Sequence, residues 1–349
     1  MRFGIYAEMQ CPPEKPHAQL YWEIQRQIEH ADEVGFDVYA TIDHHFSPEF
    51  SISANPLALF SAAAQRTRRI RFRTALHVLP PKNPLELAGQ IAAADIITGG
   101  RLECGVGRGH AWLYHGFGIP IEESQARYEE AFGLLIRAWT EERFSHHGRF
   151  WQIDDARVVP RPLQRPHPPI LLGGTSDSTY ETAGKKGYGI MVPPLLPLAA
   201  MERQLSLYRE ACAKHGHEAN LVYLRPLYLG DDPAQVRHEC ERALLNFVAF
   251  NATPATLIRH SAKQLQEAGY GFYAGGALES LTALSYEDLL KQDIAFVGTP
   301  ERVIEKINWL QQKVGITEFD ALTNYGGIAH WQSLKQQELF AQYVMPAFK

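Results

Sequence analysis

The sequence carries a group of residues suited to proton transfer at positions 43–45. Asp43, His44 and His45 directly follow an apolar stretch over residues 36–42. Histidine can gain or lose a proton near neutral pH, and an adjacent carboxylate can orient its ring. The pattern predicts a general base with an orienting acid, although a surface turn that contains histidines has the same composition.

A metal site is the alternative for the histidines, because His77, His110 and His115 also follow apolar stretches. This alternative is weaker, because adjacent residues such as His44 and His45 can bind one ion only in an irregular backbone. The sequence also lacks the paired carboxylates that would complete the site of a barrel hydrolase. The four cysteines lack CxxC spacing, so we expect free thiols in a reducing compartment. We therefore expect no bound metal.

Two glycine-rich segments could bind a phosphate. In residues 105–109, Arg108 can pair with an anion while the glycines let a ligand approach the backbone. In residues 173–179, hydroxyl side chains follow Gly174 at an expected helix start: Thr175, Ser176 and Thr179. Backbone N–H groups at such a start favour phosphate, whereas Ser176 or Asp177 could equally serve only as a helix cap. Together the segments predict one phosphate pocket.

These residues all follow short apolar stretches, so expected strands must position them. Eight stretches are separated by segments with helical spacing, which is typical of βαβ units and a parallel sheet. Eight units favour a closed (β/α)8 TIM barrel, whose site lies at the C-terminal ends of the strands. The expected strands cover residues 2–7, 36–42, 70–78, 102–106, 169–173, 188–192, 221–229 and 318–323.

Between these strands, helices are expected over residues 19–34, 56–65 and 85–97, followed by a long helix over 122–144. Residues 147–169, rich in Pro and aromatic residues, predict a hairpin or ordered loop. Residues 253–293 interrupt the rhythm after the seventh strand, and their glycines could act as hinges. Their composition is compatible with a lid or with a surface insertion. We treat residues 1–349 as a single domain with this insertion.

Charge and composition narrow the functional class. The 349 residues have a formal net charge of −5 and are 45% hydrophobic, which predicts a large core and no basic surface for nucleic acid. No apolar run approaches the roughly 20 residues of a membrane span. The N-terminal stretch is too short for a secretory signal. We expect a cytoplasmic protein that binds neither nucleic acid nor membrane.

The motifs, taken in order, resemble the bacterial luciferase-like flavin-dependent monooxygenases. The resemblance runs from residue 1 to 349 and is weakest over 253–293. No single motif decides it, but their order does. The motifs are Asp43-His44-His45-Phe46, Asn55-Pro56-Leu57, Arg66-Thr67-Arg68-Arg69-Ile70, Leu79-Pro80 with Asn83-Pro84, Gly99-Gly100-Arg101-Leu102, Gly105-Val106-Gly107-Arg108-Gly109, Phe117-Gly118, Arg161-Pro162, Pro166-His167-Pro168-Pro169, Gly173-Gly174, Tyr325-Gly326-Gly327 and Met345-Pro346.

The resemblance implies a barrel that binds reduced FMN, usually supplied by a separate flavin reductase, and that forms a homodimer. In such enzymes O2 is the co-substrate. It adds to the flavin, and the resulting peroxyflavin oxygenates a small organic substrate. The family resemblance thus implies an oxidoreductase that incorporates oxygen, while the substrate itself is not implied.

By position, the resemblance also assigns roles to residues. His44 corresponds to the catalytic histidine, with His45 beside it. Cofactor binding falls to two groups: the isoalloxazine ring would rest against one strand end, where the family often has a non-prolyl cis peptide, and the phosphate would lie at the glycine-rich segments. These groups are Thr74, Ala75 and Leu76 for the ring, and Arg108, Gly174, Thr175, Ser176 and Thr179 for the phosphate.

Three positions depart from the family pattern. Asp43 replaces the usual Glu, and Gly107 stands where light-emitting subunits carry a reactive cysteine, which makes luminescence doubtful. Arg73 stands where glycine is common, and the sequence gives no reason for it. Two other functions stay open on the same barrel: hydride transfer with the deazaflavin F420, and a non-catalytic flavin-binding partner subunit. The Asp-His-His-Phe pattern favours the FMN enzyme.

Overall fold

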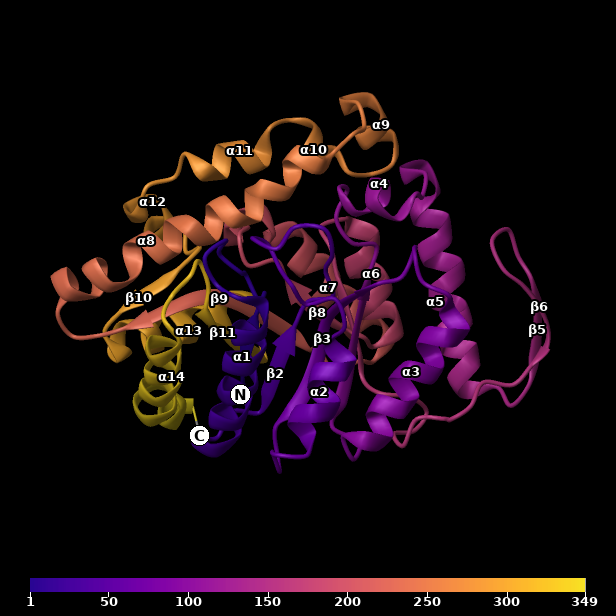
Figure 1. The fold of residues 1–349 in the computed structure, drawn as a ribbon, viewed down its shortest axis with the longest axis horizontal. Coiled ribbons are helices and arrows are strands. Elements are labelled where there is room, and N and C mark those ends of the chain that lie inside the picture. The colour runs from indigo at the N-terminus through magenta and orange to yellow at the C-terminus, as the bar shows by residue number, and fades with distance from the viewer. Residues whose placement is uncertain (349) are drawn as a thin grey trace.

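Eight parallel strands form a closed barrel at the centre of the molecule (Figure 1). The computed structural model describes residues 1–348, except for the side chains of residues 277–279. Pairing of β8 with β9 closes the ring, which confirms the predicted (β/α)8 barrel. In order around the barrel the strands are β1 (Arg2–Ala7), β2 (Val38–Thr41), β3 (Arg71–Val78), β4 (Leu102–Gly107), β7 (Ile170–Gly173), β8 (Gly189–Val192), β9 (Leu221–Leu229) and β11 (Glu318–Asn324).

Helices surround the barrel and cover its outer face. Several begin at a side-chain cap followed by proline: Asn55, Asn83, Asp232 and Thr299 each accept a hydrogen bond from a first-turn N–H group. None of the helices that residues 1–348 form is long and apolar enough to cross a membrane. The main helices are α1 (His17–Val34), α2 (Pro56–Ala64), α3 (Pro84–Ile97), α5 (Ser124–Thr140), α6 (Asp177–Lys186), α7 (Glu202–His215), α8 (Pro233–Ala252), α13 (Pro300–Val314) and α14 (His330–Leu339).

The predicted helix over residues 122–144 is shorter than expected. A short 3₁₀ turn, η1 (Ile121–Glu123), precedes α5, and the backbone leaves the helix at Glu141, which is extended. The chain then forms a hairpin of β5 (Phe144–His147) and β6 (Gln152–Ala156). Phe144 is buried beneath the guanidinium of Arg137, so its apolar side chain belongs to the hairpin contact with α5 rather than to a longer helix.

Two small elements were not predicted from the sequence. The helix α4 (Leu113–Phe117) follows the glycine-rich end of β4, and the strand β10 (Phe296–Gly298) pairs with the last part of β9. Both are shorter than the windows over which periodicity can be recognised. Both α4 and β10 lie beside residues 253–293, the segment that covers the C-terminal end of the barrel.

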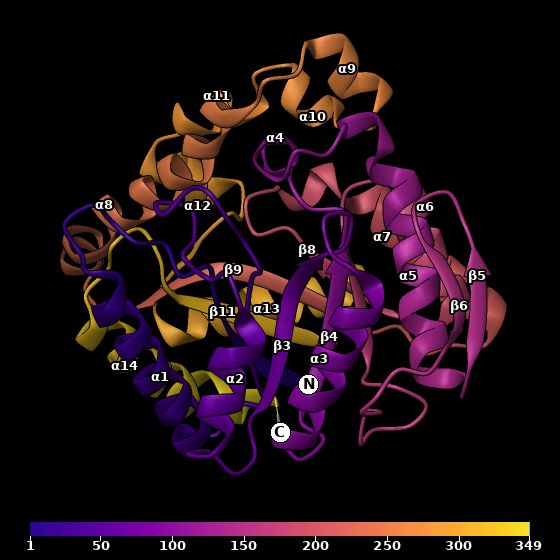
Figure 2. The same cartoon turned by 45° about the vertical axis from the view of Figure 1, so that its right-hand side comes forward.

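Residues 253–293 cover the C-terminal ends of the strands, close to α4 (Figures 1 and 2). Tyr270 and Tyr273 pack against aromatic residues that follow β4, including Trp112 and Tyr114. The segment therefore lies over the end of the barrel where the sequence places the functional residues. Its elements are η3 (Thr253–Leu257), α9 (Ala262–Glu267), α10 (Gly271–Ala274), α11 (Ala277–Thr282) and α12 (Tyr286–Lys291).

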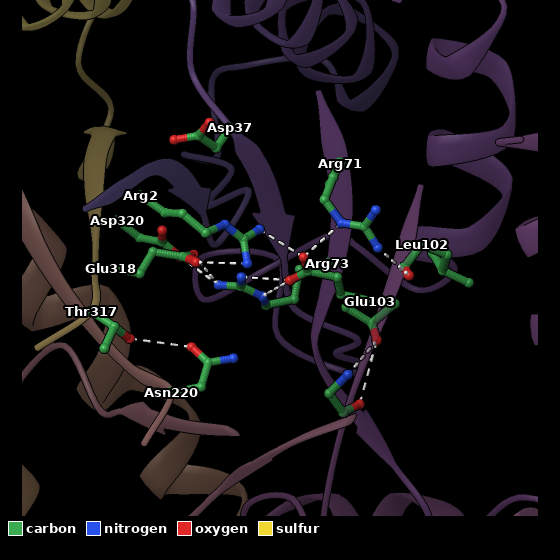
Figure 3. A network of polar contacts seen from close by, with 12 residues as sticks. Arg2, Asp37, Arg71, Arg73, Leu102, Glu103, Asn220, Thr317, Glu318 and Asp320 are labelled. Carbon is green, nitrogen blue, oxygen red and sulfur yellow. Dashed lines mark hydrogen bonds and ion pairs between the residues drawn. The ribbon is translucent and has the colours of Figure 1, made fainter. Parts of the chain in front are cut away.

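Charged side chains fill the barrel near its opposite, N-terminal end (Figure 3). Arg73 is fully buried and forms ion pairs with Glu103 at 2.6 Å, Glu318 at 2.5 Å and Asp320 at 3.1 Å. Arg2 also pairs with Glu103, at 2.7 Å. The structure thus explains the unusual arginine at position 73: it neutralises carboxyl groups that two other strands direct into the barrel.

Candidate active site

A cavity of about 310 Å³ opens at the C-terminal end of the barrel. It is lined by strand ends and, from the covering segment, by Gly269, Tyr270, Phe272, Tyr273 and Leu281. Most of the predicted cofactor-binding residues lie in its wall: Ala75, Leu76, Arg108, Gly174, Thr175, Ser176 and Thr179. Among the other predicted site residues, Thr74 is buried within β3, and His44 and His45 lie outside the wall.

The predicted phosphate turn connects β7 to α6. Ser176 occupies the position before the helix, yet its side chain does not cap the first-turn N–H groups. Its hydroxyl instead lies 2.8 Å from the Thr179 hydroxyl. Thr175 and Thr179 line the same cavity, so hydroxyl groups gather at a helix start whose dipole favours an anion. The turn therefore fits a phosphate better than it fits a simple helix cap.

Arg108 provides a positive charge on the same cavity wall. Its guanidinium donates to the carbonyl oxygens of Ala268 at 2.9 Å and Gly269 at 3.2 Å, and it lies 4.5 Å from the ring centre of Tyr270. Within the described part of the chain, no carboxylate forms an ion pair with it. Arg108 is thus available to an anionic ligand, and it also contacts the segment that covers the cavity.

The end of β3 forms an apolar part of the wall. The peptide bond between Ala75 and Leu76 is cis, as the family resemblance led us to expect. The Leu76 side chain occupies space left by glycines on the next strands, because a Cβ atom at Gly107 or Gly173 would lie within 2.8 Å of it. These close approaches place the apolar Leu76 side chain against both neighbouring strands in the cavity wall.

Asp43 is the centre of a buried polar cluster after β2. Its carboxylate contacts Lys82 at 2.5 Å, His45 at 3.0 Å and His77 at 3.4 Å. Burial alone would raise the pKa of Asp43, but hydrogen bonds from His45 and His77 and the charge of Lys82 outweigh it and hold that pKa well below its usual range. Asp43 is therefore ionised and orients the surrounding groups.

His44 lies behind the cavity wall rather than in it. Its ring packs 4.2 Å from that of Phe50, and its Nε2 accepts a hydrogen bond from the Trp112 indole at 3.4 Å. Burial, with neighbouring His110 and His45, keeps the pKa of His44 well below its usual range, so the ring is neutral. Because Nε2 is the acceptor, the proton resides on Nδ1, which is buried without a partner.

One histidine and one carboxylic acid in the wall were not assigned to the site from the sequence. His110 stacks on Trp112 with ring centres 4.3 Å apart, and its Nδ1 lies 2.8 Å from the Tyr273 hydroxyl. Burial lowers the pKa of His110 to about 4. His110 therefore stays neutral and joins the strand end of β4 to the covering segment. Its position after the glycine-rich stretch was the available signal.

Glu8 is the second residue that was missed. It directly follows β1, lines the cavity and is only 2% exposed. Gln10 and Asn251 both donate to its Oε2, at 3.1 and 2.9 Å. Burial outweighs these hydrogen bonds and raises the pKa of Glu8 to about 8. A carboxylic acid directly after the first predicted strand was the signal in the sequence.

The described residues contain no group of three or more His, Cys, Asp or Glu side chains that could hold a metal ion. His44, His77 and His110 instead face aromatic and hydrogen-bonding partners. The described residues therefore offer no set of ligands for the metal-dependent alternative.

A model of the luciferase-like monooxygenase family matches residues 1–318. The chain belongs to this family. The match covers every strand of the barrel up to the start of β11, together with the cavity wall described above. The family membership that the ordered motifs predicted is therefore confirmed.

Similar proteins agree over nearly the full length. The oxygenase component of a flavin-dependent trigonelline monooxygenase from Acinetobacter baylyi is 27% identical, with 100% of this chain and 96% of that protein covered. The crystal structure of the monooxygenase RslO1 from Streptomyces bottropensis has a TM-score of 0.81 and 28% identity, with both chains fully covered. The oxygenating constituent of 3,6-diketocamphane monooxygenase from Pseudomonas putida, in complex with FMN, shares the fold with a TM-score of 0.78 and 23% identity over 99% of this chain and 98% of that one.

Proposed function

We propose that this chain is the oxygenase component of a two-component system. It uses reduced FMN, delivered by a separate flavin reductase, and O2 to transfer one oxygen atom to a small organic substrate. One observation carries the proposal: a single cavity joins Arg108, which has no ion-pair partner among the described residues, and an uncapped helix start to an apolar strand end. That combination suits a ligand with a phosphate at one end and a flat ring at the other.

The residues around the cavity fit FMN group by group. Arg108 would pair with the phosphate, while Thr175, Ser176 and Thr179 donate hydroxyl hydrogen bonds at the start of α6. Leu76 and the preceding Ala75 would support the ring. Reduced FMN, when bound, supplies the oxygen-activating chemistry, and the protein supplies position and environment.

In this proposal His44 handles a proton close to the ring. It is neutral and holds its proton on Nδ1 without a partner, so it can donate that proton or exchange it once a ligand is bound. Asp43 stays ionised and fixes His45 beside it. Trp112 and His110 lie between His44 and the cavity. Proton transfer from His44 to a ligand would therefore require a small movement of these two rings, or would pass through their N–H groups.

Residues 253–293 would keep water from the reaction. Two residues connect this segment to the site by hydrogen bonds. Arg108 donates to the carbonyl oxygens of Ala268 and Gly269, and the Tyr273 hydroxyl is hydrogen-bonded to His110. A phosphate that competes for Arg108 would change these contacts. We therefore propose that the segment acts as a lid whose position responds to the cofactor.

A labelling experiment tests the proposed reaction. The protein is supplied with reduced FMN by a separate reductase and incubated with isotopically labelled O2 and a panel of small organic substrates. We expect a product that contains one labelled oxygen atom by mass spectrometry. A product that forms without O2 when reduced F420 replaces FMN would assign the chain to hydride transfer instead. Activity that appears only as stimulation of a second protein would identify a partner subunit.

A further inference from the structure

Glu8 stands apart from the other charged groups of the cavity. The two ionised residues in the wall are Asp43, which has charged partners, and Arg108, which suits the cofactor phosphate. Among the described residues, no Arg, Lys or His forms an ion pair with Glu8. Its partners are the neutral side chains of Gln10, Asn251 and Tyr6. The carboxyl group thus has hydrogen bonds but lacks a compensating charge.

The hydrogen bonds also distinguish its two oxygens. Gln10 and Asn251 both donate to Oε2, so that oxygen cannot carry a proton. The proton of the neutral acid therefore lies on Oε1, and the Tyr6 hydroxyl is a third hydrogen-bond partner of the carboxyl group. A cationic donor would take the place of that proton. The two amide donors favour the ionised form of Glu8. What the carboxylate still lacks is a positively charged group beside it.

The strand order places Glu8 away from the cofactor phosphate. Around the barrel, β7 is the fourth strand from β1 in both directions, through β2, β3 and β4 or through β11, β9 and β8. Glu8 and the phosphate turn are therefore on opposite sides of the cavity mouth. The ring support at Ala75 and Leu76, on β3, lies between them. Space on the Glu8 side is thus left for the molecule that reacts with the flavin.

We infer that the substrate carries a cationic nitrogen, and that Glu8 is the residue that selects it by pairing with that charge. The inference rests on the proposed function for the location of the flavin. Tyr6 and Leu224 line the same part of the wall and would enclose the apolar remainder of the substrate. When the cation binds, Glu8 releases its proton to solvent, so charge is conserved within the site.

Matched pairs of probes test this inference. The FMN-loaded protein is titrated by calorimetry with benzylamine, cyclohexylamine and butylamine, and with the alcohol of each carbon skeleton. At neutral pH we expect at least one amine to bind on the order of 10-fold more tightly than its alcohol, because a charge-assisted hydrogen bond replaces a neutral one. Binding should release a proton, detected as a heat that depends on the buffer.

The variant Glu8→Gln keeps the shape of the side chain and should abolish both the amine preference and the proton release. The exposed Glu14→Gln removes the same charge from the surface and should change neither. No preference for any of the three amines, or a preference that survives Glu8→Gln, overturns the inference. An alcohol preference that Glu8→Gln removes would instead identify Glu8 as a neutral donor.

The pH dependence gives a second readout. Tyr6 is the titratable group in contact with Glu8, and it stays neutral because burial and Glu8 raise its pKa. Amine affinity should therefore rise up to about pH 8 as Glu8 loses its proton, level off above that pH, and fall again only where the amine loses its own proton. Titration of the cofactor-free protein with FMN, and then with the same amines and alcohols, tests the proposed function separately. An amine preference without FMN binding would refute only that function, and FMN binding without an amine preference would refute only the role of Glu8.

Discussion

Two buried glutamates at opposite ends of the barrel have opposite electrostatic environments. Glu103 and Glu8 are each 2% exposed. Burial alone would raise the pKa of Glu103, but Arg73, Arg2 and Arg71 outweigh it and lower that pKa to about 2. Glu8 has only neutral hydrogen-bond partners, and burial raises its pKa to about 8. The same side chain, equally buried, is ionised at one end of the barrel and protonated at the other.

The difference separates residues that stabilise the barrel from residues that we propose bind a ligand. At the N-terminal end, carboxyl groups and guanidinium groups satisfy each other within the protein. At the C-terminal end, Glu8 and Arg108 have hydrogen-bond partners but no ion-pair partner among the described residues, and Nδ1 of His44 has no hydrogen-bond partner there. Active sites generally give up stability in this way, because their groups are arranged for the ligand and not for the free protein.

The largest effect is expected from removing the central arginine of the N-terminal network. Arg73→Met leaves Glu103 and Glu318 buried without their main counter-charge, and breaking a buried ion pair in this way costs about 3–5 kcal/mol. Urea unfolding should show this loss. Arg157→Met, at an exposed arginine, is the matched control and should be nearly neutral. A loss of less than about 1 kcal/mol for Arg73→Met would mean that the network does not hold the barrel.

The next largest effect is expected at the C-terminal end of the barrel. It should change the rate of turnover rather than the free energy of unfolding. His44→Ala is expected to slow turnover by about 100-fold or more, because it removes the proposed proton-transfer group, while FMN still binds. Steady-state kinetics and an FMN titration on the same sample measure both. His146→Ala, at a histidine of the β5–β6 hairpin, serves as the control. Unchanged turnover would exclude His44 from the mechanism.

Glu8→Gln should stabilise the free protein. A group whose pKa is raised on folding contributes full stability below its unfolded pKa and loses it as pH rises through the folded pKa. For Glu8 this window runs from 4.5 to about 8, and the cost at pH 7 is on the order of 3 kcal/mol. The variant should therefore be more stable than the wild type at pH 7 and equal to it near pH 4. Equal stability at both pH values would contradict the unpaired state of Glu8.

The smallest effect is expected at the phosphate pocket. Arg108→Met should weaken FMN binding by about 10-fold and leave riboflavin binding unchanged, because only FMN carries the phosphate. Fluorescence titration with both flavins measures the difference. Equal losses for the two flavins would show that Arg108 acts by holding residues 268 and 269 rather than by binding phosphate.

The fold could be predicted from the sequence because its signal is repeated. All eight barrel strands were expected close to their observed positions, since each is an apolar run followed by a helical segment. The end of the helix over residues 122–144 was wrong, because Phe144 fits a helical pattern and is buried by the hairpin instead. Elements as short as α4 and β10 carry too few residues for periodicity.

Residues of the cavity wall could be predicted only where a motif existed, and their roles stay predictions. The cavity wall includes Arg108 and the turn after β7, as the resemblance implied. Glu8 carries no motif, and its significance depends on Asn251, which is far away in sequence. Arg73 likewise made sense only when Glu318 and Asp320 were seen beside it. Sequence patterns report local elements, whereas the pairing of buried charges is set by the closure of the barrel.

We propose above all that the C-terminal cavity binds reduced FMN and controls its reaction with oxygen. The direct measurement is an anaerobic titration of the protein with reduced FMN, followed by rapid mixing with oxygenated buffer in a stopped-flow spectrophotometer. We predict saturable binding and a transient absorbance that differs from both reduced and oxidised FMN. Absence of binding, or reoxidation as fast as that of free reduced FMN with no transient, would contradict the account.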